Sequence, residues 1–138
     1  MFSWKRPDNL GARGGRLALC RRTPNCVSSQ ADPADAGHRI APIPFGGSTV
    51  EAMVAARRAI ESMERASIVR EEPSGAFFYL YAEFRSKLLG FVDDVELLFD
   101  EQAGVFHVRS ASRLGRRDFG VNRKRVEALR SRLQSPAS

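Results

Sequence analysis

The sequence predicts a single α+β domain, an antiparallel sheet of four or five strands with two helices packed on one face. Two stretches place apolar residues at helical spacing, and between them lie segments in which apolar and polar residues alternate. Short turns separate these alternating segments, which favours antiparallel pairing, and the apolar face of such a sheet must be covered. The expected element order is strand, helix, four strands, helix (β-α-β4-α).

The length of 138 residues and the hydrophobic content of 43% fit one domain with one core. We predict a flexible basic N-terminal tail over residues 1–16, the domain over 17–134 and a C-terminal tail over 135–138.

Residues 1–47 are expected to be mostly irregular, because glycine and proline recur there without apolar periodicity. Within them, residues 40–43 could form a short edge strand, where proline is tolerated. The first helix is predicted to begin at Ser48. Ser48 and Glu51 have the spacing of a capping box, in which each side chain accepts a hydrogen bond from the other residue's backbone N–H. About four helical turns follow, with apolar residues recurring as far as Met63.

The period then changes from helical to two. Strands are predicted over 67–70, over 76–85, from just after Gly90 to Phe99, and over 105–111, with turns at 72–75 and 100–104. Gly104 suits a left-handed position in the second turn. A final helix is predicted over 122–133, with Asn122 as its N-cap.

The net charge of +6 is unevenly distributed. Residues 1–22 carry +5, residues 23–108 carry −6, and residues 109–138 carry +7. Basic ends on an acidic body could attract nucleic acid, anionic lipid or an acidic ligand. The same pattern also arises from charges that only keep a tail and a helix face soluble.

Polar residues gather near the predicted strand ends and the start of the last helix. Guanidinium and hydroxyl groups before a helix N-terminus suit an anionic ligand. The alternative is a polar network that fixes the chain connection and caps the helix. The candidate ligand-binding residues are Arg85, Asp93, Asp94, Arg109, Ser110, Ser112, Arg113, Asn122 and Arg123.

Strict alternation places Asp93 on the same strand face as the apolar Val95 and Leu97, so its carboxylate should point inward. A buried carboxylate needs a cation, hydrogen-bond donors or a proton, and Arg85 and Arg109 are the expected partners. It could be a ligand-gripping group, a structural ion pair, or turned outward by a bulge.

Cys20 and Cys26 are the only cysteines, and a turn between them could bring the thiols together. Three interpretations remain open: inert structural thiols, a redox-active pair, or a metal site with His38 as a third ligand. We expect a cytoplasmic protein, in which a lasting disulfide is disfavoured.

No Ser/His/Asp order, HExxH or dinucleotide-binding pattern is present, so no catalytic residue is assigned and enzymatic activity is not favoured. No apolar run approaches the roughly 18 residues of a membrane helix, and the first 19 residues do not resemble a secretory signal.

Several stretches together resemble a bacterial and plastid family known as domain of unknown function 1499. The stretches are residues 19–20 and 24–29, residues 84–86 and 90–96, residues 107–115, and Asp118, Gly120, Val121, Asn122 and Arg123. The resemblance covers roughly residues 17–134 and implies that the Pro24–Ser29 segment belongs to the domain. It implies no activity.

The expected function is therefore that of a non-catalytic module that binds a small anionic ligand or a protein partner. Alternatives are a redox-active or metal-linked protein that uses Cys20 and Cys26, and nucleic-acid binding through the basic ends. No cofactor is assigned.

Overall fold

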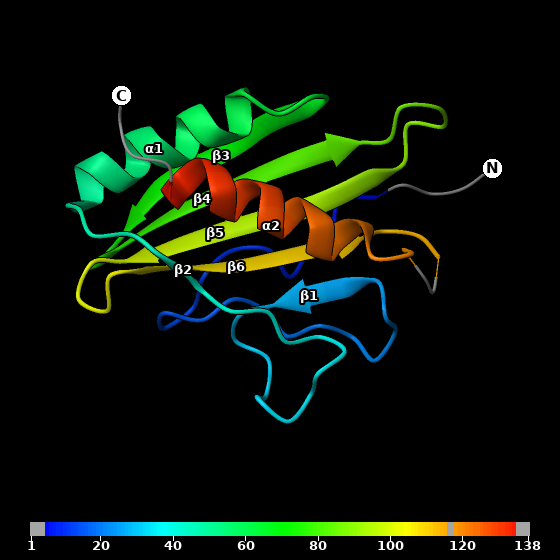
Figure 1. Ribbon diagram of the computed structural model, residues 1–138, viewed down its shortest axis with the longest axis horizontal. Coiled ribbons are helices and arrows are strands. Elements are labelled where there is room, and N and C mark those ends of the chain that lie inside the picture. Colours follow the sequence, from blue (N-terminus) through cyan, green and yellow to red (C-terminus); the bar gives the residue numbers. More distant parts are fainter. Residues whose placement is uncertain (1–4, 116–117, 135–138) are drawn as a thin grey trace.

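A computed structural model describes residues 5–115 and 118–134, and the statements below concern these residues. It shows one six-stranded sheet with both helices on the same face (Figure 1). The elements are β1 (Cys26–Ser28), β2 (Ile43–Pro44), α1 (Thr49–Glu61), β3 (Ala66–Ser74), β4 (Phe77–Arg85), β5 (Val92–Asp100), β6 (Val105–Ser112) and α2 (Val121–Gln134). The predicted α+β class is confirmed.

The strands lie in the order β1-β6-β5-β4-β3, and β2 also pairs with β6. All of these pairings are antiparallel. The prediction of four or five strands was too low, because β1 went unrecognised. A strand of three residues is too short to show periodicity, and β1 forms by pairing with β6 far along the chain. The first strand expected at 40–43 is the two-residue β2, beginning at Ile43.

Helix α1 begins where the sequence predicted. The Ser48 hydroxyl accepts from the Glu51 amide at 3.1 Å, and the Glu51 carboxylate accepts from the Ser48 amide at 3.0 Å, so the capping box is complete. The small buried residues Ala52, Ala56 and Ala59 let α1 approach the sheet closely. Ile60, on the same helix, is fully buried in the core between the helices and the sheet.

Strand β3 is longer than expected, because the turn predicted at 72–75 is mostly strand. Pro73 pairs with Phe78 in the ladder. The prediction read Pro73 as a turn residue, but β3 lies at the edge of the sheet, where a missing N–H can face solvent. The chain reverses instead at Gly75, which has a positive φ of 63°.

The core lies between the helices and the sheet. Alternate residues of β4, β5 and β6 point toward α1 and α2, as the period of two predicted. Phe45, Phe99 and Phe106 pack edge to face or tilted at one end of this core. The strand residues of the core are Phe78, Leu80, Ala82, Phe84, Val95, Leu97, Phe99, Phe106 and Val108.

Helix α2 begins at Val121, one residue before the predicted start, and Asn122 is not its N-cap. The Lys124 amide donates to the Gly120 carbonyl, which places the cap at Gly120. The carboxylate of Asp118 accepts from the amides of Gly120 and Asn122. Asn122 is instead fully buried beneath the helix. Its residue type suits a cap, and the prediction overlooked that Asp118 could satisfy these amides.

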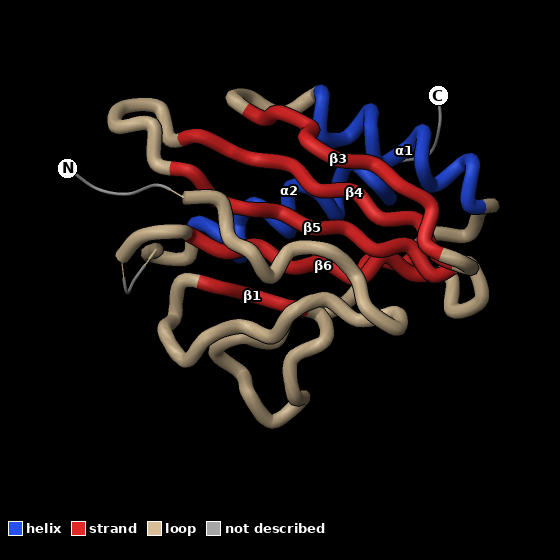
Figure 2. Tube along the Cα trace, turned by 180° about the vertical axis from the view of Figure 1, so that it is seen from behind, coloured by secondary structure: helices blue, strands red, loops and turns tan. Residues whose placement is uncertain are grey.

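The opposite face of the sheet is covered by residues 5–17, which we call the N-terminal strap (Figure 2). Residues 5–16 of the strap were predicted to belong to a flexible tail, and residue 17 to the domain. Leu17 is buried against Tyr79, Tyr81 and Leu98, and the Gly11 amide donates to Glu96 at 2.8 Å. Residues 1–4 and the predicted C-terminal tail at 135–138 lie outside the described residues.

Among the described residues, no helix has both the length and the apolar character needed to cross a membrane.

Candidate functional site

The nine predicted ligand-binding residues do not form one cluster, because neighbouring residues of a strand point to opposite faces of the sheet. Asp93, Ser110, Ser112 and Asn122 meet on the helix-covered face. Asp94, Arg109 and Arg113 lie on the strap-covered face. Arg85 and Arg123 belong to neither group.

Asn122 is the centre of the group on the helix-covered face. Its side-chain oxygen accepts from the Ser110 hydroxyl at 2.6 Å, and its amide donates to the Ser112 hydroxyl at 2.9 Å. The same amide donates to Asp118 at 2.7 Å and to the carbonyl of Asn25. The network fixes α2 to β6 and to the residue before β1, which is the structural alternative foreseen for these residues.

Asp93 points to the helix face, as alternation predicted, but its expected partners were wrong. Its carboxylate pairs with Arg125 of α2 at 2.7 Å, whereas Arg85 lies exposed at the end of β4 and Arg109 lies on the other face. The Arg125 guanidinium also lies over the Phe84 ring, 4.9 Å from its centre. The prediction considered only cations on neighbouring strands, whereas the partner, Arg125, lies on the helix that packs over the sheet.

The strap-covered face holds a buried network of acids, tyrosines and arginines. The Arg113 guanidinium donates to Glu83 at 2.6 Å and to Asp94 at 2.9 Å. The Tyr81 hydroxyl lies within hydrogen-bond distance of both carboxylates, to which it offers its one proton, and Arg6 of the strap contacts Glu83 at 2.7 Å. The hydrogen bond from Arg6 is the largest reason why the pKa of Glu83 falls to about 2.

Deeper under the strap, Arg109 faces Glu96 at 3.7 Å. Burial lowers the pKa of Arg109 and raises that of Glu96. Arg109 is 6% exposed and Glu96 is fully buried, so this pair is closed to solvent in this structure.

Arg123 is occupied by a loop. Its guanidinium donates to the carbonyls of Arg39, Ala36 and Gly37. It therefore fastens the segment between β1 and β2 to α2.

Cys20 and Cys26 form a disulfide with an S–S distance of 2.02 Å. His38, the suggested third metal ligand, has its ring nitrogens 2.8 Å from the Asp35 carboxylate and 2.9 Å from the Thr23 carbonyl. These contacts raise the pKa of His38, with the Thr23 carbonyl as the larger cause. His38 thus contacts and stabilises the loop of residues 20–26 that the disulfide closes. Within the described part of the chain, no group of three or more His, Cys, Asp or Glu side chains could hold a metal ion.

A groove of about 880 Å³ opens at the end of the sheet that carries the β4–β5 turn. We call it the end groove. It lies between α2, the segment after α1, the β4–β5 turn and the connection from β6 to α2. Its apolar lining residues are Met63, Phe84, Phe91, Val92, Leu114, Phe119, Val121 and Ala128. Arg85, Asp93 and Ser112, three of the predicted ligand-binding residues, also line it.

Basic side chains outnumber acidic ones around the end groove. Its basic residues are Arg65, Arg85, Lys124, Arg125 and Arg132, and its acidic residues are Glu64, Asp93 and Asp118. Arg125 and Arg65 pair with Asp93 and Glu64, and Asp118 caps α2. Arg85 and Lys124 are exposed and pair with no carboxylate among the described residues. The groove therefore combines an apolar floor with cations that can meet an anion.

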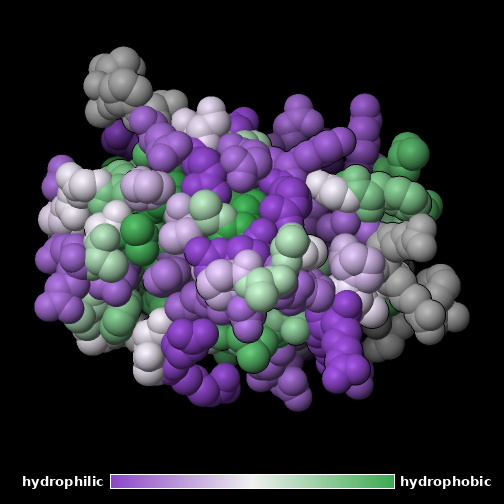
Figure 3. Space-filling model, turned by 60° about the horizontal axis from the view of Figure 1, so that its bottom comes forward, coloured by the Kyte–Doolittle hydropathy of each residue, from purple (hydrophilic) through white to green (hydrophobic). Residues whose placement is uncertain are grey.

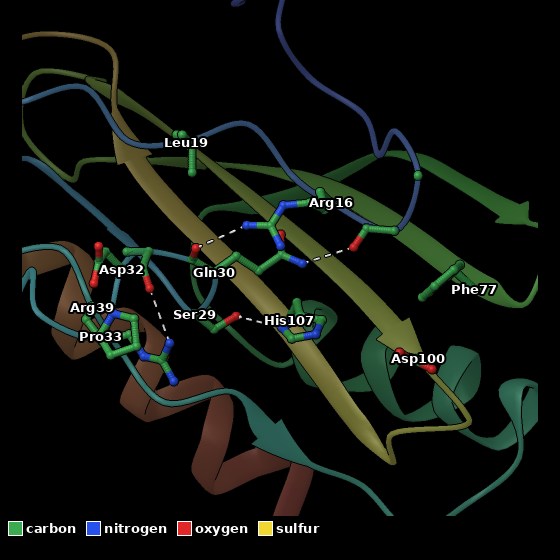
Figure 4. A pocket seen from close by; sticks show the side chains of 13 residues that line it. Arg16, Leu19, Ser29, Gln30, Asp32, Pro33, Arg39, Phe77, Asp100 and His107 are labelled. Atoms are coloured by element: carbon green, nitrogen blue, oxygen red, sulfur yellow. Dashed lines mark hydrogen bonds between the residues drawn. The ribbon is translucent and has the colours of Figure 1, made fainter.

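A second cavity, of about 830 Å³, lies on the strap-covered side (Figure 4). Ser29 points toward His107 there, with 3.2 Å between its hydroxyl and Nδ1, and burial lowers the pKa of His107. Arg16 and Arg39 donate to backbone carbonyls and are balanced by Asp32 and Asp100. This balance makes the second cavity less suited to an anion than the end groove.

Most of the end groove was not predicted from the sequence. Phe84, Phe119 and Lys124 line it, and none of them is among the predicted ligand-binding residues. The one sequence feature that could have indicated them is the presence of aromatic residues close to basic residues in two connecting segments. No spacing rule joins those turns, because they meet only through the sheet.

Comparison with known families gives one match. The family model described as "Protein of unknown function (DUF1499)" matches residues 16–133. Neither the curated proteins nor the solved structures give a significant match to this chain. Because the matched region covers most of the sequence, the chain belongs to the DUF1499 family of proteins of unknown function.

Proposed function

We propose that this protein is a non-catalytic binding module whose end groove holds an amphiphilic anion, a molecule with an apolar body and an acidic head. The observation that carries the proposal is the pairing of an aromatic floor with two exposed cations that have no acidic partner in the described chain. The earlier expectation of an anionic ligand is thereby refined to one that also has an apolar part.

The size of the groove suits a small molecule. Ligand pockets are typically about 300–1,000 Å³ and mostly apolar, with a few polar groups that orient the ligand. Phe84 and Phe91 supply aromatic surface for the apolar body. Arg85 and Lys124 come from β4 and α2, so they can approach an acidic head from two sides.

Asp93 and Asp118, two of the carboxylates that line the groove, make structural contacts. Asp93 is held by Arg125, and Asp118 accepts three hydrogen bonds from Gly120 and Asn122. These bonds lower the pKa of Asp118 against the opposing effect of burial, which alone would raise it. Because both carboxylates are engaged in structural contacts, the groove suits a binding role better than acid–base catalysis.

The test is calorimetric titration with dodecyl phosphate below its micelle concentration. Dodecyltrimethylammonium, with the same chain and the opposite charge, is the matched ligand control. We expect dodecyl phosphate to bind at least tenfold more tightly than the cation. The Arg85→Gln/Lys124→Gln variant should lose most of this preference, while Arg58→Gln, an exposed change on α1, should keep it. Equal affinity for both ligands, or no binding of either, would contradict the proposal.

A redox role for Cys20 and Cys26 stays a prediction, as does the cytoplasmic location. The disulfide supports the first and sits less easily with the second, since lasting disulfides are rare in the cytoplasm. Alkylation of freshly lysed cells addresses both. A mixture of reduced and oxidised protein would favour a cycling pair, and full oxidation would favour a structural bond in an oxidising compartment.

Nucleic-acid binding through the basic ends also stays a prediction. Several of the arginines concerned have internal partners, including Arg6 with Glu83 and Arg125 with Asp93. Affinity for a nucleic acid that falls steeply with salt would support this role.

A further inference from the structure

The exposed large hydrophobic residues of the described chain are concentrated at one end. Five of the nine lie on the two loops that border the end groove. The β4–β5 turn contributes Leu88, Leu89 and Phe91, and the connection into α2 contributes Phe119 and Val121. Leu88 is 90% exposed and Phe119 is 88% exposed. Apolar side chains so fully exposed beside a cavity commonly mark an interaction surface.

The two loops lie at the same end of the molecule. Figure 1 shows the β4–β5 turn and the connection from β6 to α2 projecting beyond the sheet on the same side. Figure 3, turned about the horizontal axis, shows a hydrophobic group protruding at this end, while the rest of that face is mostly hydrophilic. We call the exposed apolar residues Leu88, Leu89, Phe91, Phe119 and Val121 the apolar tips.

Basic residues surround the apolar tips. Arg85, at the end of β4, and Lys87 both precede Leu88, and Lys124 follows Val121 on α2. All three are exposed, and none pairs with a carboxylate in the residues that the structure describes. The loop from Ser86 to Gly90 contains no acidic residue. Such a surface is complementary to one that is apolar inside and negatively charged outside.

The backbone conformation of Phe119 also supports an interaction surface at this end. This residue adopts a positive φ of 53°, a backbone conformation that is uncommon and unfavourable for a bulky residue. The conformation places its ring in solvent, where the fold gains little apolar burial in return. A binding partner that buries the ring would offset that cost.

We propose that the apolar tips insert into the surface of a membrane that contains anionic lipids. The leucine and phenylalanine side chains enter the boundary between head groups and acyl chains, while Arg85, Lys87 and Lys124 contact lipid phosphates. The end groove then opens directly toward the membrane. The proposal deepens the proposed function, on which it rests, by naming the source of the amphiphilic anion as a lipid of that membrane.

The test is co-sedimentation with phosphatidylcholine vesicles that contain about 30% phosphatidylglycerol, whose surface is negatively charged, compared with vesicles of pure phosphatidylcholine. We expect at least tenfold tighter binding to the anionic vesicles, weakened by salt. Leu88→Ser/Leu89→Ser should reduce vesicle binding at least tenfold. Val50→Ser/Val54→Ser, which removes two exposed valines from α1, is the matched control and should bind like the unchanged protein.

Titration of the Leu88→Ser/Leu89→Ser variant with dodecyl phosphate separates the two proposals. Retained binding of dodecyl phosphate together with lost vesicle binding supports membrane insertion through the tips. If the unchanged protein binds dodecyl phosphate but no vesicle, membrane insertion is overturned, the proposed function stands, and the tips are left to a protein partner. Loss of dodecyl phosphate binding with vesicle binding intact would overturn the role of the tips.

Discussion

The guanidinium of Arg113 lies between the carboxylates of Glu83 and Asp94 on the face of the sheet opposite the helices. Its side chain is 8% exposed, and it pairs with two acids that are themselves largely shielded from solvent. Arg113 was predicted to bind a ligand. In the structure it pairs with Glu83 and Asp94, and this pairing offsets the cost of placing acids on the strap-covered face.

Replacing Arg113 should therefore be costly. We expect Arg113→Met to lower the free energy of unfolding by about 3–5 kcal/mol, because it removes the cation shared by two buried carboxylates, while Arg6 stays paired with Glu83 alone. Urea unfolding measures this change. The control is Arg57→Ala, which breaks a solvent-screened pair with Glu71 and should change the free energy of unfolding far less. Similar losses in both variants would show that the network under the strap adds nothing beyond surface pairing.

Glu83 should make the stability depend on acidity. Its pKa is about 2 in the folded chain, below the ordinary value of 4.5, chiefly because of its hydrogen bond to Arg6. A depressed pKa means that its contribution is present above about pH 4.5 and is lost as the pH falls toward 2. Urea unfolding between pH 6 and 2.5 should show a steeper loss for the unchanged protein than for Glu83→Gln. Parallel pH curves would refute this assignment.

At the same scale, the sequence predicted that Asp93 points inward but not that Arg125 is its partner. Alternation fixes the direction of a side chain along one strand. The partner comes from a helix 32 positions later in the chain, and its approach depends on how the layers pack.

Among the elements, the long ones other than β3 were predicted well and the short ones were not. Helix α1 and strands β4 to β6 contain enough residues to show their period, and their ends lie close to those expected. Strands β1 and β2 contain three and two residues, and they exist because β6 offers an edge to pair with. Their formation depends on long-range pairing, which a local pattern does not contain.

The disulfide stabilises the segment that leads into β1. It links residues six positions apart, and a loop of this size is worth about 2 kcal/mol in the chain-entropy model. We expect Cys20→Ser/Cys26→Ser to lower the free energy of unfolding in urea by that amount, with the fold retained. Unchanged stability in the variant would indicate that the segment is held by other contacts, such as that of His38 with Thr23.

Seen as a whole, the molecule has two differently covered faces and one open end. The helices cover an apolar face, the strap covers a face rich in paired charges, and the end groove lies where the β4–β5 turn and the start of α2 leave the sheet uncovered. The class of fold follows from periodicity. The strap and the groove do not, because each is made by segments that are distant in sequence and brought together by the sheet.

The measurement that tests the central claim most directly is an NMR titration of the isotopically labelled protein with dodecyl phosphate below its micelle concentration. We predict that the largest amide shifts fall on the end groove, at residues such as Phe91, Phe119 and Lys124, with little change near His107 in the second cavity. Shifts centred on His107, or an absence of saturable shifts, would contradict the assignment of the end groove as the binding site.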